Sequence, residues 1–134
     1  MANILIVDDE AVFARAIKRK LERENHECLI SSTVNEARQF LKRGPTQKVK
    51  FQPDLVLLDM RLPDGDGIEL LTDIEDGVPV IVITAYGDID NAITAMRSGA
   101  SDYLRKPLDL KELDLVITRV LQTQEIHTRL NLSQ

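Results

Sequence analysis

Five side chains that could do chemistry each follow a short apolar run of the sequence. They are Asp8, Asp9, Asp59, Thr84 and Lys106. Clustered carboxylates repel one another and resist burial, so their meeting makes sense if a divalent cation lies among them. Oxygen ligands without histidine or cysteine select a hard ion, and a few protein ligands plus waters suit octahedral Mg²⁺. The three aspartates therefore indicate a Mg²⁺ site.

The lysine and the threonine indicate a second bound group. A metal alone would not call for Lys106 beside it, because an ammonium competes for the same carboxylates. An ammonium, a hydroxyl and Mg²⁺ together suit a dianionic group, of which phosphoryl is the obvious candidate. A carboxylate in that setting can be a nucleophile and form an acyl phosphate. The five side chains together therefore predict a phosphoryl site.

Alternating strands and helices are expected to bring these side chains together. Apolar runs of strand length lie at 4–7, 28–30, 55–58, 78–83 and 103–104. Helix-length stretches separate them, which predicts five strands and five helices in a doubly wound α/β domain with a parallel sheet covered on both faces. Ligands of such sheets bind outside the carboxyl ends of the strands. The sequence thus predicts one crevice that receives side chains from four strands.

Apolar residues at helical spacing mark the helices between these strands. The stripes are Phe13, Ala16, Ile17 and Leu21 in the first helix, Ile68, Leu71 and Ile74 in the third, and Ile89, Ile93 and Met96 in the fourth. Such stripes are typical of helices that pack one face on a core. Gly99 is expected to end the fourth helix, and Asp109 is a plausible N-cap of the fifth.

The composition bounds the class of protein. The chain has 134 residues, 43% of them hydrophobic, one cysteine and a formal net charge of −5. This length fits one domain, and one cysteine excludes a disulfide framework within the chain. The negative charge argues against a duplex-DNA footprint, which needs a basic stripe. No apolar run approaches the roughly 20 residues that span a bilayer, and we expect a cytoplasmic domain without membrane contact.

Four segments of the sequence carry a resemblance to a known family. They are "VDD", "LLDMRLPDGDG", "VITAYG" and "DYLRKPLD". In this order they are similar to the receiver domain of bacterial two-component response regulators, over residues 3 to about 122. The resemblance implies a flavodoxin-like sheet with strand order 2-1-3-4-5. It also implies a receiver domain over 1–122, with 123–134 as a linker stub or helix extension.

The resemblance assigns roles to the acidic residues. Asp59 resembles the residue that takes a phosphoryl group from a phosphohistidine on a sensor histidine kinase. Asp9 resembles the direct Mg²⁺ ligand, and Asp8 a ligand that acts partly through water. Asp59 and the backbone carbonyl of Arg61 would complete the protein's share of the coordination. The chain would then be a phosphoacceptor with self-phosphorylation and self-dephosphorylation chemistry only, rather than a classical enzyme.

The remaining site residues follow from the same resemblance. Thr84 and Lys106 resemble the pair that binds phosphoryl oxygens, and Tyr103 the switch aromatic that turns inward when Thr84 is drawn to the phosphoryl group. The Lys106–Pro107 bond resembles the family's cis peptide. Glu10 is expected to be an acid in the first turn of a helix, favoured by the helix dipole.

The resemblance also implies partners. Phosphorylation should shift an equilibrium toward an active surface on the fourth helix, fifth strand and fifth helix, with dimerisation on activation. Ile89, Arg97 and Arg105 are expected on or near that surface. The sensor kinase should dock near the first helix, where Ala11, Ala14 and Arg15 are expected to point outward.

Within the family, the segment 84–109 most resembles receivers attached to AAA+ transcription activators that work with alternative sigma factors. Two departures from that subfamily are Leu108, where phenylalanine is usual, and the long basic segment 43–53, which is expected to be a solvated surface loop. A downstream output domain, controlling transcription, is expected outside this chain.

One other function stays open, and three further classes do not fit the sequence. A pseudo-receiver would keep the fold and signal by protein contact without phosphorylation. Phosphatases of the haloacid dehalogenase type need a second acid two residues after the nucleophile, where this chain has Arg61. The "DGDG" at 64–67 has the wrong register for a calcium loop and is better interpreted as a turn before the third helix. No Walker-type loop is present in the sequence.

Overall fold

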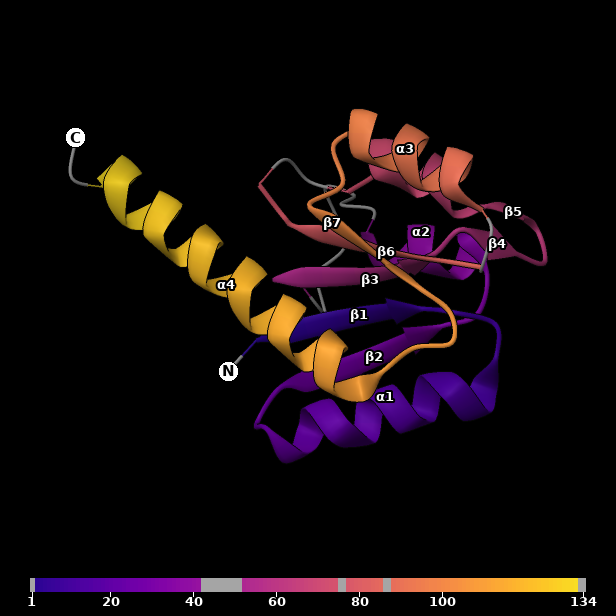
Figure 1. Ribbon diagram of the computed structural model, residues 1–134, viewed down its shortest axis with the longest axis horizontal. Coiled ribbons are helices and arrows are strands. Elements are labelled where there is room, and N and C mark those ends of the chain that lie inside the picture. Colours follow the sequence, from indigo (N-terminus) through magenta and orange to yellow (C-terminus); the bar gives the residue numbers. More distant parts are fainter. Residues whose placement is uncertain (1, 42–51, 75–76, 86–87, 133–134) are drawn as a thin grey trace.

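The computed structural model describes residues 2–41, 52–74, 77–85 and 88–132 (Figure 1). Only the last two residues of the predicted surface loop at 43–53 fall within these ranges. Among the described helices, none combines the length and apolar character needed to span a bilayer.

A parallel five-stranded sheet forms the centre of the molecule. Its strands are β1 (Asn3–Val7), β2 (Glu27–Ser31), β3 (Leu55–Asp59), β6 (Val80–Thr84) and β7 (Asp102–Arg105), in the order β2-β1-β3-β6-β7. Counted along the chain, this order is 2-1-3-4-5, which confirms the predicted topology. All five residues of β3 and of β6 are buried. Continuous apolar runs form these strands because helices cover both faces of the sheet.

Helical segments cover the two faces. They are α1 (Ala11–Arg23), α2 (Val34–Leu41), the 3₁₀ helix η1 (Gly67–Thr72), α3 (Ile89–Arg97) and α4 (Leu110–Leu132). One buried cluster joins α1 and α4 to the sheet, and a second joins α2, η1 and α3 to the opposite face. Figure 1 shows α4 continuing away from the sheet toward the C-terminus.

The first helix is rotated relative to the prediction. Ala14 is fully buried with Ile17 and Leu21, whereas Ala16 is exposed. Residues at i, i+3 and i+7 share one face of a helix, which explains why Ala14 belongs to the buried stripe. The expected outward position of Ala14 is therefore wrong, while Ala11 and Arg15 are exposed as expected.

The fourth apolar stripe faces outward rather than toward the sheet. Ala92 and Ala95 of α3 are buried, whereas Ile89, Ile93 and Met96 are among the exposed large hydrophobic residues. Small alanines let the helix approach the sheet closely, and the larger side chains are left on the opposite side. Gly99 follows α3 with a φ of 110°, consistent with its predicted role at the helix end.

The segment after β3 makes a short hairpin before η1. Strands β4 (Arg61–Leu62) and β5 (Gly65–Asp66) pair antiparallel around the "PD" turn. The carboxylate of Asp64 accepts hydrogen bonds from the backbone N–H groups of Val34 (2.7 Å) and Asn35 (3.0 Å) at the start of α2. The hydrogen bonds from Asn35 and Val34 lower the pKa of Asp64. The loop that follows Asp59 is thereby tied to a neighbouring helix.

Gly67 is required by the path of this loop. Its N–H donates to the carbonyl of Met60 (2.8 Å), and a Cβ at this position would lie 2.1 Å from the backbone oxygen of Asp59. Gly67→Ala is expected to destabilise the protein by about 3 kcal/mol or more, because backbone must move to relieve the overlap. Urea unfolding measures the loss.

Gly99→Ala is the matched control for this prediction. Its φ of 110° strains any side chain, but a Cβ there meets nothing within 4 Å. The expected loss is therefore smaller, about 1 kcal/mol. A Gly67→Ala protein at least as stable as Gly99→Ala would contradict the steric argument.

Candidate functional site

The predicted site residues meet at one edge of the sheet. In the strand register, Val7 lies beside Leu58 and Asp59 beside Ile83, so β1, β3 and β6 end at nearly the same level. Asp8 follows β1, and Thr84 and Asp59 end their strands. The carboxyl ends of parallel strands thus deliver these side chains to the same edge of the sheet, as the sequence predicted.

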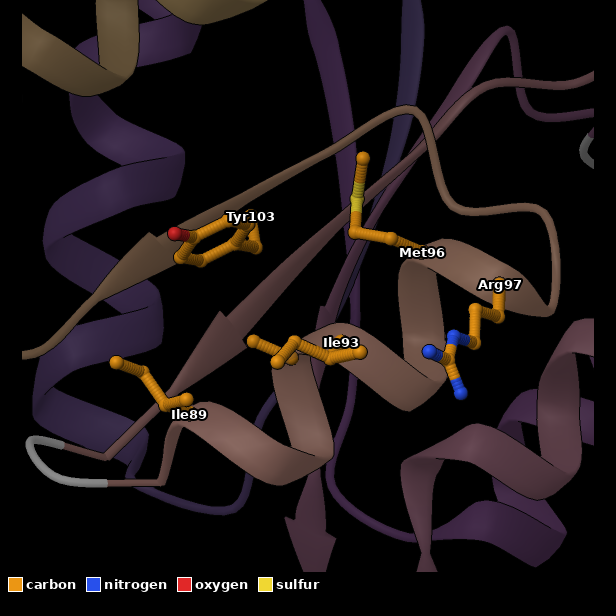
Figure 2. Close-up of a pocket in the computed structure, with 6 residues that line it drawn as sticks. Ile89, Ile93, Met96, Arg97 and Tyr103 are labelled. Carbon is orange, nitrogen blue, oxygen red and sulfur yellow. The ribbon is translucent and has the colours of Figure 1, made fainter.

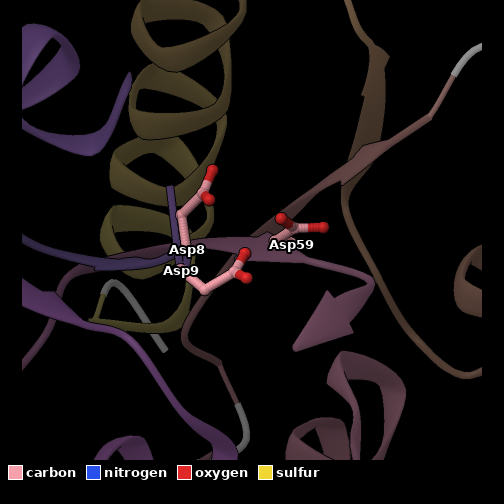
Figure 3. Close-up of side chains that lie close together, drawn as sticks. All are labelled: Asp8, Asp9 and Asp59. Carbon is pink, nitrogen blue, oxygen red and sulfur yellow. The ribbon is translucent and has the colours of Figure 1, made fainter. Parts of the chain in front are cut away.

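Asp8, Asp9 and Asp59 form a compact carboxylate cluster (Figure 3). One oxygen from each lies within 4.8 Å of the others. Asp8 is 2% exposed and Asp59 7%, whereas Asp9 is exposed. Asp8 Oδ1 accepts a hydrogen bond from the Glu10 N–H (2.9 Å), but its buried Oδ2 makes no hydrogen bond. A buried carboxylate oxygen without a hydrogen bond, beside two further carboxylates, fits a hard cation such as Mg²⁺.

Burial raises the pKa of Asp8 to about 6. The Glu10 N–H opposes this shift, and the negative charge of Asp59 adds to it. Since the folded-state pKa lies above the unfolded value, ionised Asp8 opposes folding at neutral pH. That opposition begins to decline as the pH falls through about 6, where the folded-state carboxyl group takes up a proton, and it is gone only below the ordinary value of 3.8.

Asp8→Asn is therefore expected to stabilise the metal-free protein at about pH 7.5. Asparagine keeps an oxygen for the Glu10 N–H and carries no charge. The rise of the Asp8 pKa from 3.8 to about 6 sets an upper bound of about 3 kcal/mol. About 1–2 kcal/mol is expected once the lost attraction to Lys106 is subtracted. Thermal unfolding in excess chelator measures the difference, which should shrink toward about pH 5. Asp66→Asn, a change of an exposed carboxylate in β5, is the control.

If Asp8→Asn stabilises the protein less at neutral pH than at acidic pH, the claim that ionised Asp8 opposes folding is wrong. With added Mg²⁺, the wild-type protein is expected to become more stable than Asp8→Asn, because the variant has lost an anionic ligand for the ion.

Lys106 lies against the carboxylate cluster. Its Nζ is 3.3 Å from Asp59 Oδ2, 3.1 Å from Glu10 Oε1 and 3.8 Å from Asp8 Oδ2. Burial lowers the pKa of Lys106, but the hydrogen bond to Glu10 and the charges of Asp59 and Asp8 outweigh it and raise the pKa. The ammonium is therefore charged at neutral pH. The Lys106–Pro107 peptide bond is cis, as predicted.

Thr84 and Tyr103 occupy different environments in this structure. Thr84 is buried, and its carbonyl accepts a hydrogen bond from the Lys106 N–H (2.8 Å). Tyr103 is 40% exposed. It lines an apolar groove of about 390 Å³ together with α3 side chains, including Ile89 and Ile93 (Figure 2).

Arg61 connects Asp59 to the loop before α3. Its backbone N–H donates to Asp59 Oδ1 (3.1 Å), and its exposed guanidinium pairs with Asp88 at 3.5 Å. Asp88 also accepts hydrogen bonds from the Asn91 side chain at 2.8 Å. The expected ligand role of the Arg61 carbonyl stays a prediction.

Two neighbours of Lys106 were not predicted as site residues. Glu10 contacts the ammonium, and Nζ lies 5.2 Å from the centre of the Phe13 ring. Both residues stand at the start of α1, three positions apart, which places them on one side of the helix. The signal in the sequence that could have identified them is their position within four residues after Asp9, at the edge where the strands end.

Residues 4–118 match the family described as the response regulator receiver domain. The KDP operon transcriptional regulatory protein KdpE of Escherichia coli is 39% identical over 115 residues, which cover 84% of this chain and 48% of that protein. The response regulator protein PilR of Pseudomonas aeruginosa is 40% identical over 121 residues, which cover 88% of this chain and 26% of that protein. The chain thus spans about a quarter to a half of these relatives.

Solved structures agree with this assignment. A CheY-like response regulator receiver domain protein from Methanospirillum hungatei superposes with a TM-score of 0.84 at 30% identity, covering 95% of this chain and 98% of that one. NtrX from Brucella abortus gives a TM-score of 0.87 at 30% identity, covering 99% of this chain and 29% of that one. The strand order, the carboxylate cluster at the carboxyl edge of the sheet and these matches lead to one conclusion: the chain belongs to the response regulator receiver domain family.

Proposed function

We propose that this domain is a phosphorylation-activated switch in which Asp59 accepts a phosphoryl group from a histidine of a sensor kinase. One observation carries the proposal: Asp59 is buried, belongs to the carboxylate cluster and is also contacted by Lys106 at 3.3 Å. A buried aspartate with only a structural role is satisfied by one partner of opposite charge. Asp59 instead lies beside both the Lys106 ammonium and two further carboxylates. This combination suits a carboxylate that must carry a dianionic group.

The transfer step follows from the chemistry of the Asp59 carboxylate and of the phosphohistidine on the kinase. A carboxylate oxygen of Asp59 attacks the phosphorus, the bond from phosphorus to the donor imidazole nitrogen breaks, and that nitrogen takes up a proton. Water later cleaves the acyl phosphate, which releases inorganic phosphate and restores the Asp59 carboxylate. The Lys106 ammonium would stabilise negative charge on the phosphoryl oxygens throughout.

Mg²⁺ is the proposed cofactor. Asp8, Asp9, Asp59 and the backbone carbonyl of Arg61 would hold it, with Asp8 acting partly through water. Bound there, the ion would neutralise charge on the phosphoryl group. The absence of a hydrogen bond to the buried Oδ2 of Asp8 and the closeness of the three carboxylates support this assignment.

A conformational change would transmit phosphorylation to the surface. Thr84 and Lys106 would contact phosphoryl oxygens, and Tyr103, now 40% exposed, would turn inward behind Thr84. This movement would alter the surface built by α3, β7 and α4, where Tyr103 meets Ile89 and Arg97 in the apolar groove. That surface is proposed to control the output and to dimerise on activation. Sedimentation with and without beryllofluoride, a phosphoryl stand-in, tests dimerisation: an unchanged mass would contradict it.

The partners remain part of the proposal. The sensor histidine kinase would dock near α1, where Ala11 and Arg15 are exposed. The receiver domain would comprise 1–122, with 123–134 as a helix extension or linker to an output domain, in a cytoplasmic protein. Transcription control is the proposed output, since several relatives are named as transcriptional regulators. The resemblance of segment 84–109 is the reason to propose an AAA+ activator as the output domain.

A pseudo-receiver that acts only through protein contacts is the second candidate. Incubation with Mg²⁺ and acetyl phosphate distinguishes the two. A mass gain of one phosphoryl group that requires Mg²⁺ supports the switch, whereas an unresponsive wild-type chain supports the contact module. The contacts among Asp59, Lys106 and the other two aspartates favour the switch.

A further inference from the structure

Glu10 is placed to act on Lys106. It occupies the N-cap position of α1, where its side chain makes no capping hydrogen bond. Its carboxylate instead contacts the Lys106 ammonium at 3.1 Å, closer than the 3.3 Å contact from Asp59. Serine, threonine, aspartate or asparagine would cap the helix better. The local structure therefore leaves the Glu10 carboxylate available for the lysine.

The backbone of Glu10 links the same residue to the carboxylate cluster. Its N–H donates to Asp8 Oδ1 (2.9 Å), which fixes the start of α1 against the crevice. Phe13 lies one helical turn further, with its ring centre 5.2 Å from the lysine Nζ. The start of α1 thus gives the ammonium two neighbours, a carboxylate and an aromatic ring.

The three carboxylates around Lys106 differ in what a bound cation would do to them. Among the described residues, Asp8 and Asp59 belong to the group that could hold a metal, whereas Glu10 does not. A divalent cation would neutralise much of the attraction that Asp8 and Asp59 exert on the ammonium. Glu10, with its side chain 61% exposed, would keep its charge and its contact.

We propose that Glu10 is a positioning residue that competes with the incoming phosphoryl group for the Lys106 ammonium. This inference rests on the proposed function of Asp59. A dianionic phosphoryl group must draw Lys106 away from Glu10 or share the ammonium with it. Glu10 thereby weakens binding of phosphoryl donors at the crevice, and it does so most for small anionic donors that have no protein surface to dock on.

The test compares wild type with Glu10→Gln at saturating Mg²⁺, with beryllofluoride as the probe. Glutamine keeps the size of the side chain and removes its charge. Because the Glu10–Lys106 pair is partly solvated, the variant is expected to bind beryllofluoride about two- to fivefold more tightly. The initial rate of phosphorylation by subsaturating acetyl phosphate is expected to rise by the same factor. The affinity of Glu10→Gln for Mg²⁺ alone is expected not to rise. Without Glu10, the Lys106 ammonium contacts only Asp8 and Asp59, where it competes with the ion.

A second comparison shows whether the effect passes through the lysine. In a Lys106→Met background, Glu10→Gln is expected to leave the acetyl phosphate rate unchanged, although that rate is low. Glu36→Gln is the matched control, since this acid in the first turn of α2 approaches Ser32 at 3.5 Å instead of a lysine. It should change neither affinity nor rate.

Each outcome decides the proposal. Unchanged or weaker beryllofluoride binding by Glu10→Gln overturns it, and so does a gain that persists without Lys106 or appears equally in Glu36→Gln. If wild type itself binds no beryllofluoride and takes up no phosphoryl group, the proposed function fails, and the positioning role fails with it. The two failures are distinguishable because only the second abolishes the wild-type response.

Discussion

Asp59→Asn is expected to take up no phosphoryl group from acetyl phosphate in the presence of Mg²⁺, under conditions in which the wild-type protein gains one. The reason is chemical: an amide is a poor nucleophile, and it would not form an acyl phosphate. Asparagine has nearly the same shape and keeps an oxygen to accept the Arg61 N–H hydrogen bond, now 3.1 Å long. The fold is therefore expected to persist.

Intact-protein mass spectrometry measures this loss directly. Asp66→Asn is the matched control, because Asp66 is an exposed acid in the same segment and lies outside the carboxylate cluster. It should be phosphorylated like wild type. Phosphorylation of Asp59→Asn at the wild-type level would show that another residue is the acceptor.

Lys106→Met is expected to separate metal binding from phosphoryl transfer. The rate of phosphorylation by acetyl phosphate should fall by about 100- to 1,000-fold, because a charged group aimed at developing negative charge is lost. Affinity for Mg²⁺ should rise instead, since the ammonium at 3.3 Å from Asp59 and 3.8 Å from Asp8 no longer competes with the ion. Methionine keeps an apolar side chain over the Phe13 ring.

Calorimetric Mg²⁺ titration and timed mass spectrometry give the two readouts. Lys111→Met is the control, because Lys111 is exposed in the first turn of α4 and only its backbone N–H contacts Asp109. It should leave both quantities unchanged. A Lys106→Met protein that binds Mg²⁺ more weakly and is phosphorylated at the normal rate would contradict the assigned role.

The sheet and the crevice could be predicted from the sequence because they depend on simple regularities. Buried parallel strands are apolar over their whole length, and the residues that follow them reach one edge. This rule places Asp8, Asp59, Thr84 and Lys106 correctly without knowledge of any contact. The family resemblance then supplied the strand order, which apolar patterning alone leaves open.

Features that depend on exact packing could not be predicted in this way. The buried face of α1 depends on one alanine, and apolar spacing alone favoured Ala16 over Ala14. The α3 stripe was apolar but faces outward, because Ala92 and Ala95 fit against the sheet. Glu10 was interpreted as a helix acid because its partner, Lys106, lies 96 positions away in the chain.

The most direct test of the account is a crystal structure of the protein with Mg²⁺ and beryllofluoride. The account predicts a cation held by Asp9 and Asp59, beryllofluoride on a carboxylate oxygen of Asp59, and the Lys106 ammonium in contact with a fluorine. If Asp59 instead points away from Lys106 and Asp9 and no cation binds at saturating Mg²⁺, the phosphoryl site proposed here does not exist.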